Sequence, residues 1–401
     1  MGGQFYVMTN SLQLFRKTTS APIKTIGKLI DVLEITEAEL NRVLELKVDE
    51  RYSSLIKIKS NGEQRIVFNP VNEVRRVQKR IKNRILKELV VWPDFIFGSI
   101  PKKKGRDPTD YVACAAKHTN ARSVLKIDIK SFFDNIHENL VFKIYKNFFG
   151  YGDDVAKILT NISCRDGSLC QGAITSSYLA SLVLYDVEPA MVAKLNRKRL
   201  VYTRYVDDIT VSSRESNYDF SYVMNVIENV LNDKELPINN KKTLVLNSGS
   251  EAILVHGLRV NTVTVRLPID EIRRIRAGVK NLELVALENG YRWSQAYRRE
   301  YYKHLGRVYK LKRIGHNQSV KLIERMEKIK PKPSRYDLKV TVKMIRKIKE
   351  TYGHDKSNFW FKRRYNVVVA RLNFLANSKK FSYKIKLLRE YVKKYKPIFS
   401  E

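Results

Sequence analysis

The chain has 401 residues, and 43% of them are hydrophobic, a share that supports a sizeable core and excludes wholesale disorder. Lysine and arginine outnumber aspartate and glutamate by 76 to 41, which gives a formal net charge of +35. This surplus indicates a polyanionic partner, most often nucleic acid, although a generally basic surface or a membrane-binding face is also consistent with it. No apolar run is long enough to span a membrane. Since the three cysteines, Cys114, Cys164 and Cys170, lack the spacing of a disulfide framework, we expect a reducing cytoplasm. Cys164 and Cys170 also lack the spacing of a zinc knuckle, so we interpret both as buried small apolar residues.

The first hundred residues predict two helices that flank a hairpin. Thr36, followed three residues later by a glutamate, is typical of a capped helix start, so residues 36–48 predict a helix. Residues 51–70 alternate apolar and polar side chains around Asn61-Gly62, which is the pattern of a β-hairpin. A basic amphipathic helix is then expected over residues 71–90.

The middle of the chain alternates strands and helices. Strands are expected at residues 123–129 and on both sides of a two-residue turn within 199–213. Helices are expected at residues 174–195 and 218–234, and residues 243–261 predict two more short strands around a glycine turn. The resulting β-α-β-β-α-β order predicts an α+β fold with a ferredoxin-like split βαβ sheet.

The last part of the chain, from about Leu267 onward, has a helical and basic pattern. Residues 331–401 hold 20 lysines or arginines and five acidic residues. This segment predicts a basic helical extension that grips an RNA, lengthens the preceding helical region or docks a partner protein.

Two adjacent carboxylates, Asp207 and Asp208, stand at the expected hairpin tip in the stretch RYVDDITV. Aspartate is favoured in turns, so this pair alone requires no function. Asp128 changes the interpretation, because it ends an apolar strand, where an unpaired acid is costly. The split βαβ order places that strand beside the hairpin, so three carboxylates are expected to converge and to repel one another unless cations lie among them.

Mg²⁺ is the cation expected at such a site, because it binds carboxylates together with substrate phosphates, and Mn²⁺ is a substitute. Two ions about 3.5–4 Å apart would hold the attacking and leaving oxygens of an in-line phosphoryl transfer. The carboxylates therefore predict nucleotide addition, which agrees with the basic composition.

Several blocks of the sequence resemble reverse transcriptases. The stretch Tyr205-Val206-Asp207-Asp208 resembles the Y-x-D-D box of that family. Other blocks follow in the family's order at residues 125–136, 169–177, 239–245 and 253–261, with fingers-like and thumb-like stretches at 59–70 and 305–314. The similarity covers roughly residues 50–330, and it is greatest to bacterial retron and defence-associated reverse transcriptases.

The resemblance implies a right-hand polymerase with fingers, a ferredoxin-like palm and a thumb. The implied organisation is an N-terminal region with fingers over residues 1–120, and a palm over 121–262 into which part of the fingers is inserted near 140–170. A helical thumb over 263–330 and the basic C-terminal extension over 331–401 complete it.

The resemblance also implies the role of each site residue. The catalytic metal ligands would be Asp128, Asp207 and Asp208, with the backbone carbonyl of Ile129 as a further ligand. Phe133 would exclude the ribose 2′-hydroxyl and so select dNTPs, although a core phenylalanine is the alternative. The other implied nucleotide-binding residues are Lys59, Arg65, Gln171, Gly172 and Lys242, and the primer and template residues are Tyr205, Val206 and Gly257. For the two lysines and the arginine, a purely solvated side chain is the competing interpretation, and Lys241 competes with Lys242.

The sequence departs from the retron pattern at three places. The retron motif N-A-x-x-H has Cys114 in place of its asparagine, and V-T-G reads Val255-His256-Gly257. In the block P-Q-G-x-x-x-S-P, Cys170 and Ser177 replace the prolines. These departures favour a defence-associated sister group, and His118 and His256 are interpreted as structural residues rather than metal ligands.

The expected function is RNA-directed DNA synthesis on an RNA template, such as an associated non-coding RNA, in antiviral defence of a bacterium. The expected partners are that RNA, a DNA primer or product, dNTPs, and a partner protein or a second copy of the chain. The alternatives are template-independent or protein-primed DNA synthesis, RNA-templated RNA synthesis, and a non-catalytic RNA-binding scaffold. The bulky Phe133 argues against RNA synthesis, and three clustered acids argue against a pure RNA binder.

Overall fold

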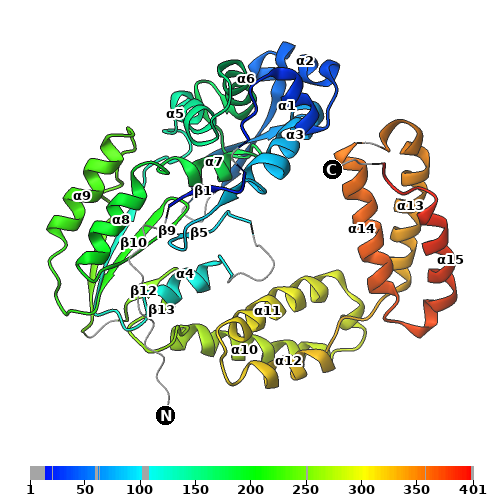
Figure 1. Cartoon of the computed structure of the whole chain (residues 1–401). Coiled ribbons are helices and arrows are strands. Elements are labelled where there is room, and N and C mark those ends of the chain that lie inside the picture. The colour runs from blue at the N-terminus through cyan, green and yellow to red at the C-terminus, as the bar shows by residue number, and fades with distance from the viewer. Residues whose placement is uncertain are drawn as a thin grey trace. The chain divides into compact units, whose positions relative to one another are not determined.

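The computed structural model of the chain describes residues 14–19, 21–58, 62, 64–101, 108–249, 252–356 and 358–398 (Figure 1). The chain divides into two compact units, Met1–Val265 and Arg266–Glu401. Within the described ranges, no helix is long and apolar enough to cross a membrane.

A five-stranded sheet forms the centre of the first unit, with the strand order β11-β6-β10-β9-β5. The strands are β5 (Ile96–Phe97), β6 (Ser123–Asp128), β9 (Val201–Tyr205), β10 (Asp208–Ser213) and β11 (Leu244–Asn247). Strand β10 pairs antiparallel with both β6 and β9, β11 pairs antiparallel with β6, and β5 pairs parallel with β9. In chain order, the four longer strands are arranged fourth, first, third, second, which is the ferredoxin-like arrangement, so the predicted α+β fold class is confirmed.

Nine α-helices accompany the sheet in the described part of the first unit, and α8 packs on β9 and on α9 (Figure 1). They are α1 (Ile26–Leu33), α2 (Glu37–Glu45), α3 (Asn72–Arg80), α4 (Tyr111–Lys117), α5 (Glu138–Lys143), α6 (Asp153–Ser163), α7 (Ser176–Leu182), α8 (Glu188–Arg197) and α9 (Ser221–Asn232). Short π-helical segments, Ile81–Leu86 and Ile144–Phe148, continue α3 and α5. One hydrophobic core joins helices α1–α3 and α5–α9 to the buried side of the sheet.

The local signals in the N-terminal region are confirmed. The Thr36 hydroxyl accepts a hydrogen bond from the Glu39 N–H at 3.2 Å, and the Glu39 carboxylate accepts one from the Thr36 N–H at 2.9 Å. This capping box begins α2. The expected hairpin is present as β2 (Tyr52–Ile58) and β3 (Gln64–Pro70), paired antiparallel along their whole lengths.

Two predictions in the middle of the chain are wrong. The single helix expected over residues 174–195 is interrupted: α7 ends at Leu182, and α8 begins at Glu188. Proline disrupts a helix interior but is tolerated in the first turn, where its missing N–H breaks no helical hydrogen bond, so a new helix begins with Pro189 in its first turn. Residues 243–261 contain three strands rather than two. Strand β11 joins the central sheet, whereas β12 (Leu254–Val255) and β13 (Leu258–Arg259) form a separate hairpin.

Two further pairs of short strands complete the first unit. Strand β1 (Arg16–Lys17) pairs with β4 (Val90–Val91), and β7 (Cys164–Arg165) pairs with β8 (Ser168–Leu169). The three cysteines are buried and free, which confirms the burial expected for Cys164 and Cys170.

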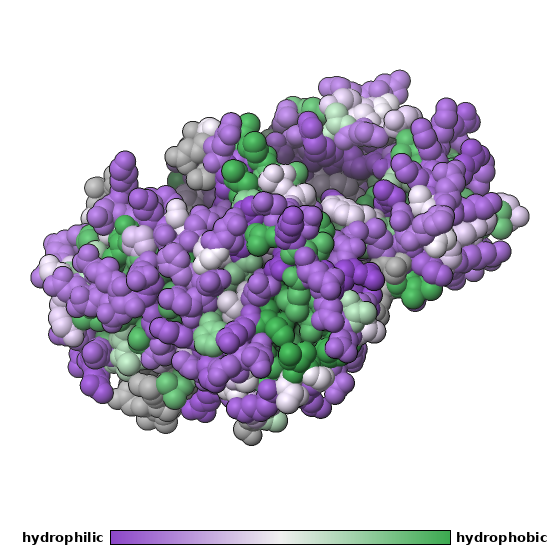
Figure 2. Space-filling model, turned by 90° about the horizontal axis from the view of Figure 1, so that it is seen from above, coloured by the Kyte–Doolittle hydropathy of each residue, from purple (hydrophilic) through white to green (hydrophobic). Residues whose placement is uncertain are grey.

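The second unit is helical, as predicted for the C-terminal part of the chain. Its helices are α10 (Ile269–Ala286), α11 (Gln295–Arg313), α12 (Ser319–Lys328), α13 (Arg335–Asp355), α14 (Phe359–Leu375) and α15 (Ser382–Lys393). Helices α13–α15 enclose a hydrophobic core of their own. On the face of the molecule that Figure 2 shows, hydrophilic side chains predominate around a smaller gathering of hydrophobic ones, as the charged composition requires.

Candidate active site

The three predicted carboxylates lie at one end of the central sheet. Asp208 is the first residue of β10 and stands directly opposite Asp128, the last residue of β6, in the antiparallel register. Asp207 precedes it in the two-residue turn between β9 and β10, and its carbonyl accepts a hydrogen bond from the Ile129 N–H at 3.1 Å. Because directly opposed residues of antiparallel strands share one face, the sheet register brings together acids that are 79 and 80 positions apart.

The electrostatics of this end of the sheet show mutual repulsion. Burial raises the pKa of Asp207 above its usual value, and the charge of Asp128 raises it further. Burial, followed by the charges of Asp207 and Asp128, raises the pKa of Asp208 to about 6. The protein therefore holds these acids in a place where ionisation is disfavoured unless positive charge is supplied.

A lysine side chain supplies the positive charge that balances the Asp128 carboxylate. The Lys242 ammonium lies 3.1 Å from Asp128 Oδ2, and its hydrogen bond to Asp128 raises the pKa of the lysine. The Asn239 side chain donates a second hydrogen bond to Asp128 at 2.9 Å. The Lys242 side chain is 65% exposed, so it is tethered at one end and otherwise faces solvent. Lys241, the competing candidate, is also exposed.

The donor chemistry of the three acids fits divalent cations that prefer oxygen ligands. Bound cations would relieve the repulsion that raises the pKa values of Asp207 and Asp208. Among the residues that the structure describes, however, no three Asp, Glu, His or Cys side chains are arranged to hold an ion. Lys242 already supplies a counter-ion at Asp128, so an ion bound there would displace the lysine or share the carboxylate with it.

The turn that carries Asp207 has an unusual backbone. Val206 has φ +61°, a left-handed conformation that is unfavourable for a β-branched residue. Gly98 makes room for the Val206 side chain, because a Cβ at Gly98 would lie 2.9 Å from Val206 Cγ2. The tip of the β9–β10 hairpin is thus held in a strained conformation by its surroundings.

Two residues that support this turn were not predicted from the sequence. Arg204 and Glu188 form a fully buried ion pair, in which the guanidinium donates to the carboxylate at 2.6 and 2.7 Å. The same guanidinium donates to the Val206 carbonyl at 3.1 Å, and so ties the turn to the start of α8. The available signals were a charged residue inside a strand otherwise rich in apolar and aromatic residues, and a glutamate directly before Pro189.

Two of the predicted nucleotide-binding residues, Arg65 and Gln171, contact each other. Arg65 on β3 donates a hydrogen bond to the side chain of Gln171, so these two lie together. The Gln171 carbonyl accepts a hydrogen bond from the Phe68 N–H at 2.8 Å. Lys59 lies outside the described residues.

Gly172 has a structural reason to be glycine. Its φ is +113°, and a Cβ there would collide with the carbonyl oxygen of Phe68. The absence of a side chain at Gly172 therefore lets its backbone lie close to strand β3.

Phe133 lies beyond the end of β6, partly exposed, with its ring 6.0 Å from that of Phe132. Phe132 is buried in the core, whereas Phe133 only packs against it. Gly257 and His256 form the turn of the β12–β13 hairpin, both with positive φ, as a type I′ turn requires.

The two histidines near the site are structural in their surroundings. His118 is buried between the hydroxyls of Thr203 and Ser212, each 2.7 Å from one ring nitrogen, and burial lowers its pKa to about 3. His256 lies with Nδ1 3.9 Å from Asp208 Oδ2 and its ring 4.8 Å from that of Tyr205. Burial lowers the pKa of His256 to about 4, so this contact is not an ion pair at neutral pH.

Comparisons with known proteins agree with the resemblance. The reverse transcriptase (RNA-dependent DNA polymerase) family matches residues 56–260. The retron Ec48 reverse transcriptase of Escherichia coli is 42% identical over 385 residues, which are 95% of this chain and 94% of that protein. The retron Se72 reverse transcriptase of Salmonella heidelberg is 28% identical over 77% of this chain and 80% of its own length. The retron Ec86 reverse transcriptase of Escherichia coli is 28% identical over 65% of this chain and 79% of its own length.

The departures at Cys114, Cys170, Ser177 and His256 had favoured a sister group outside the retron enzymes. That prediction is wrong, because a retron enzyme matches nearly the whole chain. The departures are therefore variation within one family. The chain belongs to the retron reverse transcriptases, which are RNA-directed DNA polymerases.

Proposed function

We propose that Asp128, Asp207 and Asp208 carry out two-metal nucleotidyl transfer in this reverse transcriptase. The observation that carries this proposal is the register that opposes Asp208 to Asp128 beside the turn of Asp207. When bound by the three carboxylates and the Ile129 carbonyl, two Mg²⁺ ions would activate the primer hydroxyl and neutralise the triphosphate.

The chain's own groups have the following proposed tasks. Lys242, once displaced from Asp128, is free to donate to the triphosphate. Arg65, held beside Gln171, supplies a second cation from β3. Phe133 is placed after β6 to contact the sugar of the incoming nucleotide. Replacement of Phe133 by alanine should then raise NTP incorporation relative to dNTP incorporation on the order of tenfold, and an unchanged ratio would show that it is only a core residue.

Primer extension with purified protein, an RNA template, dNTPs and Mg²⁺ tests the metal assignment. Asp207→Ala should abolish the product, while Asp233→Ala, which removes an exposed acid at the end of α9, should leave it unchanged. Both proteins should have the thermal unfolding midpoint of the unchanged chain or higher. Extension by the Asp207→Ala protein would refute the assignment.

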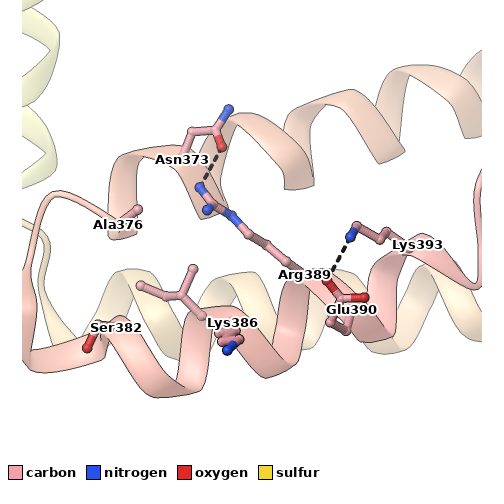
Figure 3. Close-up of a pocket in the computed structure, with 8 residues that line it drawn as sticks. Asn373, Ala376, Ser382, Lys386, Arg389, Glu390 and Lys393 are labelled. Carbon is pink, nitrogen blue, oxygen red and sulfur yellow. Dashed lines mark hydrogen bonds and ion pairs between the residues drawn. The ribbon is translucent and has the colours of Figure 1, made fainter.

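We infer that the C-terminal extension binds the structured RNA from which the enzyme copies. Helices α14 and α15 line a pocket of about 600 Å³. The face of α15 that borders it carries three cations at helical spacing, Lys386, Arg389 and Lys393 (Figure 3). The Arg389 guanidinium donates to the side-chain oxygen Oδ1 of Asn373 at 2.9 Å, which fixes its direction, and Lys393 pairs with Glu390 at 2.7 Å. A net positive pocket with oriented donors suits RNA phosphates.

A pair of charge reversals on one helix tests this site. Lys386→Glu, inside the pocket, should weaken RNA binding and lower the slope of log affinity against log salt by about one. Lys384→Glu is the matched control, since it makes the same change on the same helix at an exposed position that does not line the pocket. Equal losses in the two variants would mean that the charge acts only through the general field of the protein.

We also propose a role in antiviral defence, which the resemblance of the sequence blocks to retron and defence-associated reverse transcriptases, taken as one bacterial group, implies. Phage plaque counts on bacteria that express the protein with its RNA test this role. Protection should be lost with Asp207→Ala, and equal plaque counts with and without the unchanged protein would refute it.

A further inference from the structure

Two departures from the retron motifs meet in space. Cys114, which stands where the pattern N-A-x-x-H has asparagine, is on α4. His256, which stands where V-T-G has threonine, is in the β12–β13 turn. Cys114 Sγ lies 3.4 Å from His256 Nε2 although the residues are 142 positions apart. The two departures therefore form a single contact.

The other side of His256 faces the carboxylates. Its Nδ1 lies 3.9 Å from Asp208 Oδ2, and its ring packs against Tyr205. The histidine is thus a bridge between a buried thiol and an acid of the candidate active site.

Behind the thiol lies a chain of buried polar groups. Cys114 Sγ is 3.3 Å from Thr203 Oγ1, which is 2.7 Å from His118, whose other nitrogen is 2.7 Å from Ser212. These four residues are buried. The thiol and the Thr203 hydroxyl can each donate in their contact.

An ionised Asp208 fixes the direction of this chain, because a carboxylate only accepts hydrogen bonds. For a neutral His256 to present Nδ1–H to Asp208, its Nε2 must accept, and the Cys114 thiol is the donor in contact with it. The Thr203 hydroxyl then donates to the sulfur, and His118 donates to Thr203. One direction of donation satisfies every group from Ser212 to His256, and it leaves the Nδ1–H of His256 facing Asp208 Oδ2 across 3.9 Å, a polar contact longer than a hydrogen bond.

We propose that His256 is a positioning residue of the polymerase centre, held by Cys114 so that its Nδ1–H orients the Asp208 carboxylate for metal binding. This inference rests on the proposed function of Asp208 as a metal ligand. Partners of this kind, one step removed from the metal, typically change metal affinity or activity by about 10–100-fold when they are lost.

Variants at position 256 separate orientation from packing. His256→Phe keeps a ring beside Tyr205 and removes both nitrogens. His256→Asn keeps a donor near the place of Nδ1 and tolerates the positive φ of 48° at this position. Mn²⁺ binding in the absence of substrate, followed by electron paramagnetic resonance, reports on the ligands without turnover. We expect His256→Phe to weaken Mn²⁺ binding on the order of tenfold, and to raise the Mg²⁺ concentration for half-maximal extension by a similar factor, while His256→Asn changes either by less than about threefold.

Variants at position 114 test whether the two residues act as a unit. Cys114→Val removes the donor to Nε2 and should weaken Mn²⁺ binding in the same direction. Combined with His256→Phe, it should add little further loss, because residues in one hydrogen-bond network are not additive. The pair Cys114→Asn with His256→Thr restores the retron pattern and should bind Mn²⁺ better than either single change alone.

The outcomes distinguish the two proposals. If Asp208→Asn keeps both Mn²⁺ binding and extension, the proposed function itself fails. If Asp208→Asn loses both while His256→Phe keeps the metal affinity of the unchanged protein, His256 is only a packing residue and this inference is overturned. Should His256→Phe fail to fold, as judged by its thermal unfolding midpoint, Cys114→Val decides, and metal binding that is unchanged in that variant overturns the inference.

Discussion

At the scale of single residues, the acid cluster lowers the stability of the metal-free protein. Asp208 has a folded-state pKa of about 6, above the ordinary value of 3.8, because it is partly buried near Asp207 and Asp128. A raised carboxyl pKa stabilises the fold while the group is protonated, and this contribution is lost as the pH rises through about 6. Divalent cations would reverse the effect by supplying the missing charge.

Asp208→Asn should therefore stabilise the metal-free enzyme at pH 8. The Asp208 side chain is 46% exposed, so solvent screening reduces the gain, and we expect about 2–4 °C in the unfolding midpoint. At pH 4.5 the gain should fall to about a third, because Asp208 is then protonated in the folded protein while it is still largely ionised in the unfolded chain. Calorimetry in EDTA at both pH values, with the exposed Asp233→Asn as control, measures this. A shift of the same size at both pH values would contradict the charge explanation.

The buried ion pair behind the catalytic turn makes a second prediction. Glu188→Gln removes one charge from a pair whose side chains are fully inaccessible, and leaves the Arg204 guanidinium without its counter-ion. We expect a loss of about 3–5 kcal/mol in the free energy of unfolding. Activity should fall as well, since the guanidinium also holds the Val206 carbonyl.

An exposed pair on α15 provides the comparison. Glu390→Gln breaks the ion pair with Lys393, whose side chains are both mostly exposed, and should cost less than about 1 kcal/mol. Chemical denaturation of the two variants measures both values. Losses of equal size would mean that burial does not set the strength of the Arg204 pair.

At the scale of elements, sequence patterns predicted what is determined locally. The capping box at Thr36 and the alternation across β2 and β3 are both present, because each depends on neighbours within a few residues. The interruption between α7 and α8 was missed because apolar residues continue through it, so that both helices bury the same kind of face. The pairing of β11 with β6 follows from the predicted ferredoxin-like order, but the separate β12–β13 hairpin was missed because the alternation of residues 243–261 does not show which strands join the central sheet.

The same distinction applies to the candidate site. Asp207, Asp208 and Asp128 were recognisable because an acid beside apolar strands is locally anomalous. The burial of Glu188 and Arg204, by contrast, makes physical sense only because the two side chains pair with each other. The role of such residues depends on which distant segments of the chain come into contact. A single sequence contains no signal of which segments meet.

Gly172 provides a prediction about how elements dock. Gly172→Ala would place a methyl group against the Phe68 carbonyl in addition to straining a φ of +113°, so the contact of β3 with the Gln171 loop should be disrupted. Gly167→Ala is a matched control, since its φ of +76° is also positive but nothing lies within 4 Å of the added Cβ. Strain alone costs about 1–2 kcal/mol, and both variants should show it.

Only Gly172→Ala should also raise the KM for dNTPs, because Arg65 and Gln171 lie at this contact. Steady-state extension kinetics and thermal unfolding of both variants give the comparison. An identical KM for dNTPs in the two variants would show that the contact of β3 with the Gln171 loop plays no part in nucleotide binding.

At the scale of the whole molecule, the acids of the candidate site and the strongly basic C-terminal segment belong to different compact units. The acids belong to the first unit, whereas residues 331–401, with 20 basic and five acidic residues, belong to the second. Each unit has a hydrophobic core that shares no residue with the other. Stability of the C-terminal extension and stability of the central sheet should therefore be separable.

Leu372→Ala tests this separation. Leu372 is buried in the core of α13–α15, and its truncation should cost about 2–5 kcal/mol there. Amide hydrogen exchange should accelerate in α13–α15 while β6 and β10 keep their protection. RNA affinity should fall, yet extension of a preformed primer–template at saturating concentration should persist, because the carboxylates are undisturbed. Leu387→Ala, which truncates an exposed leucine on α15, should change none of these quantities. Faster exchange in β6 and β10 would show instead that the two units unfold as one, and RNA binding could then not be altered without loss of the catalytic sheet.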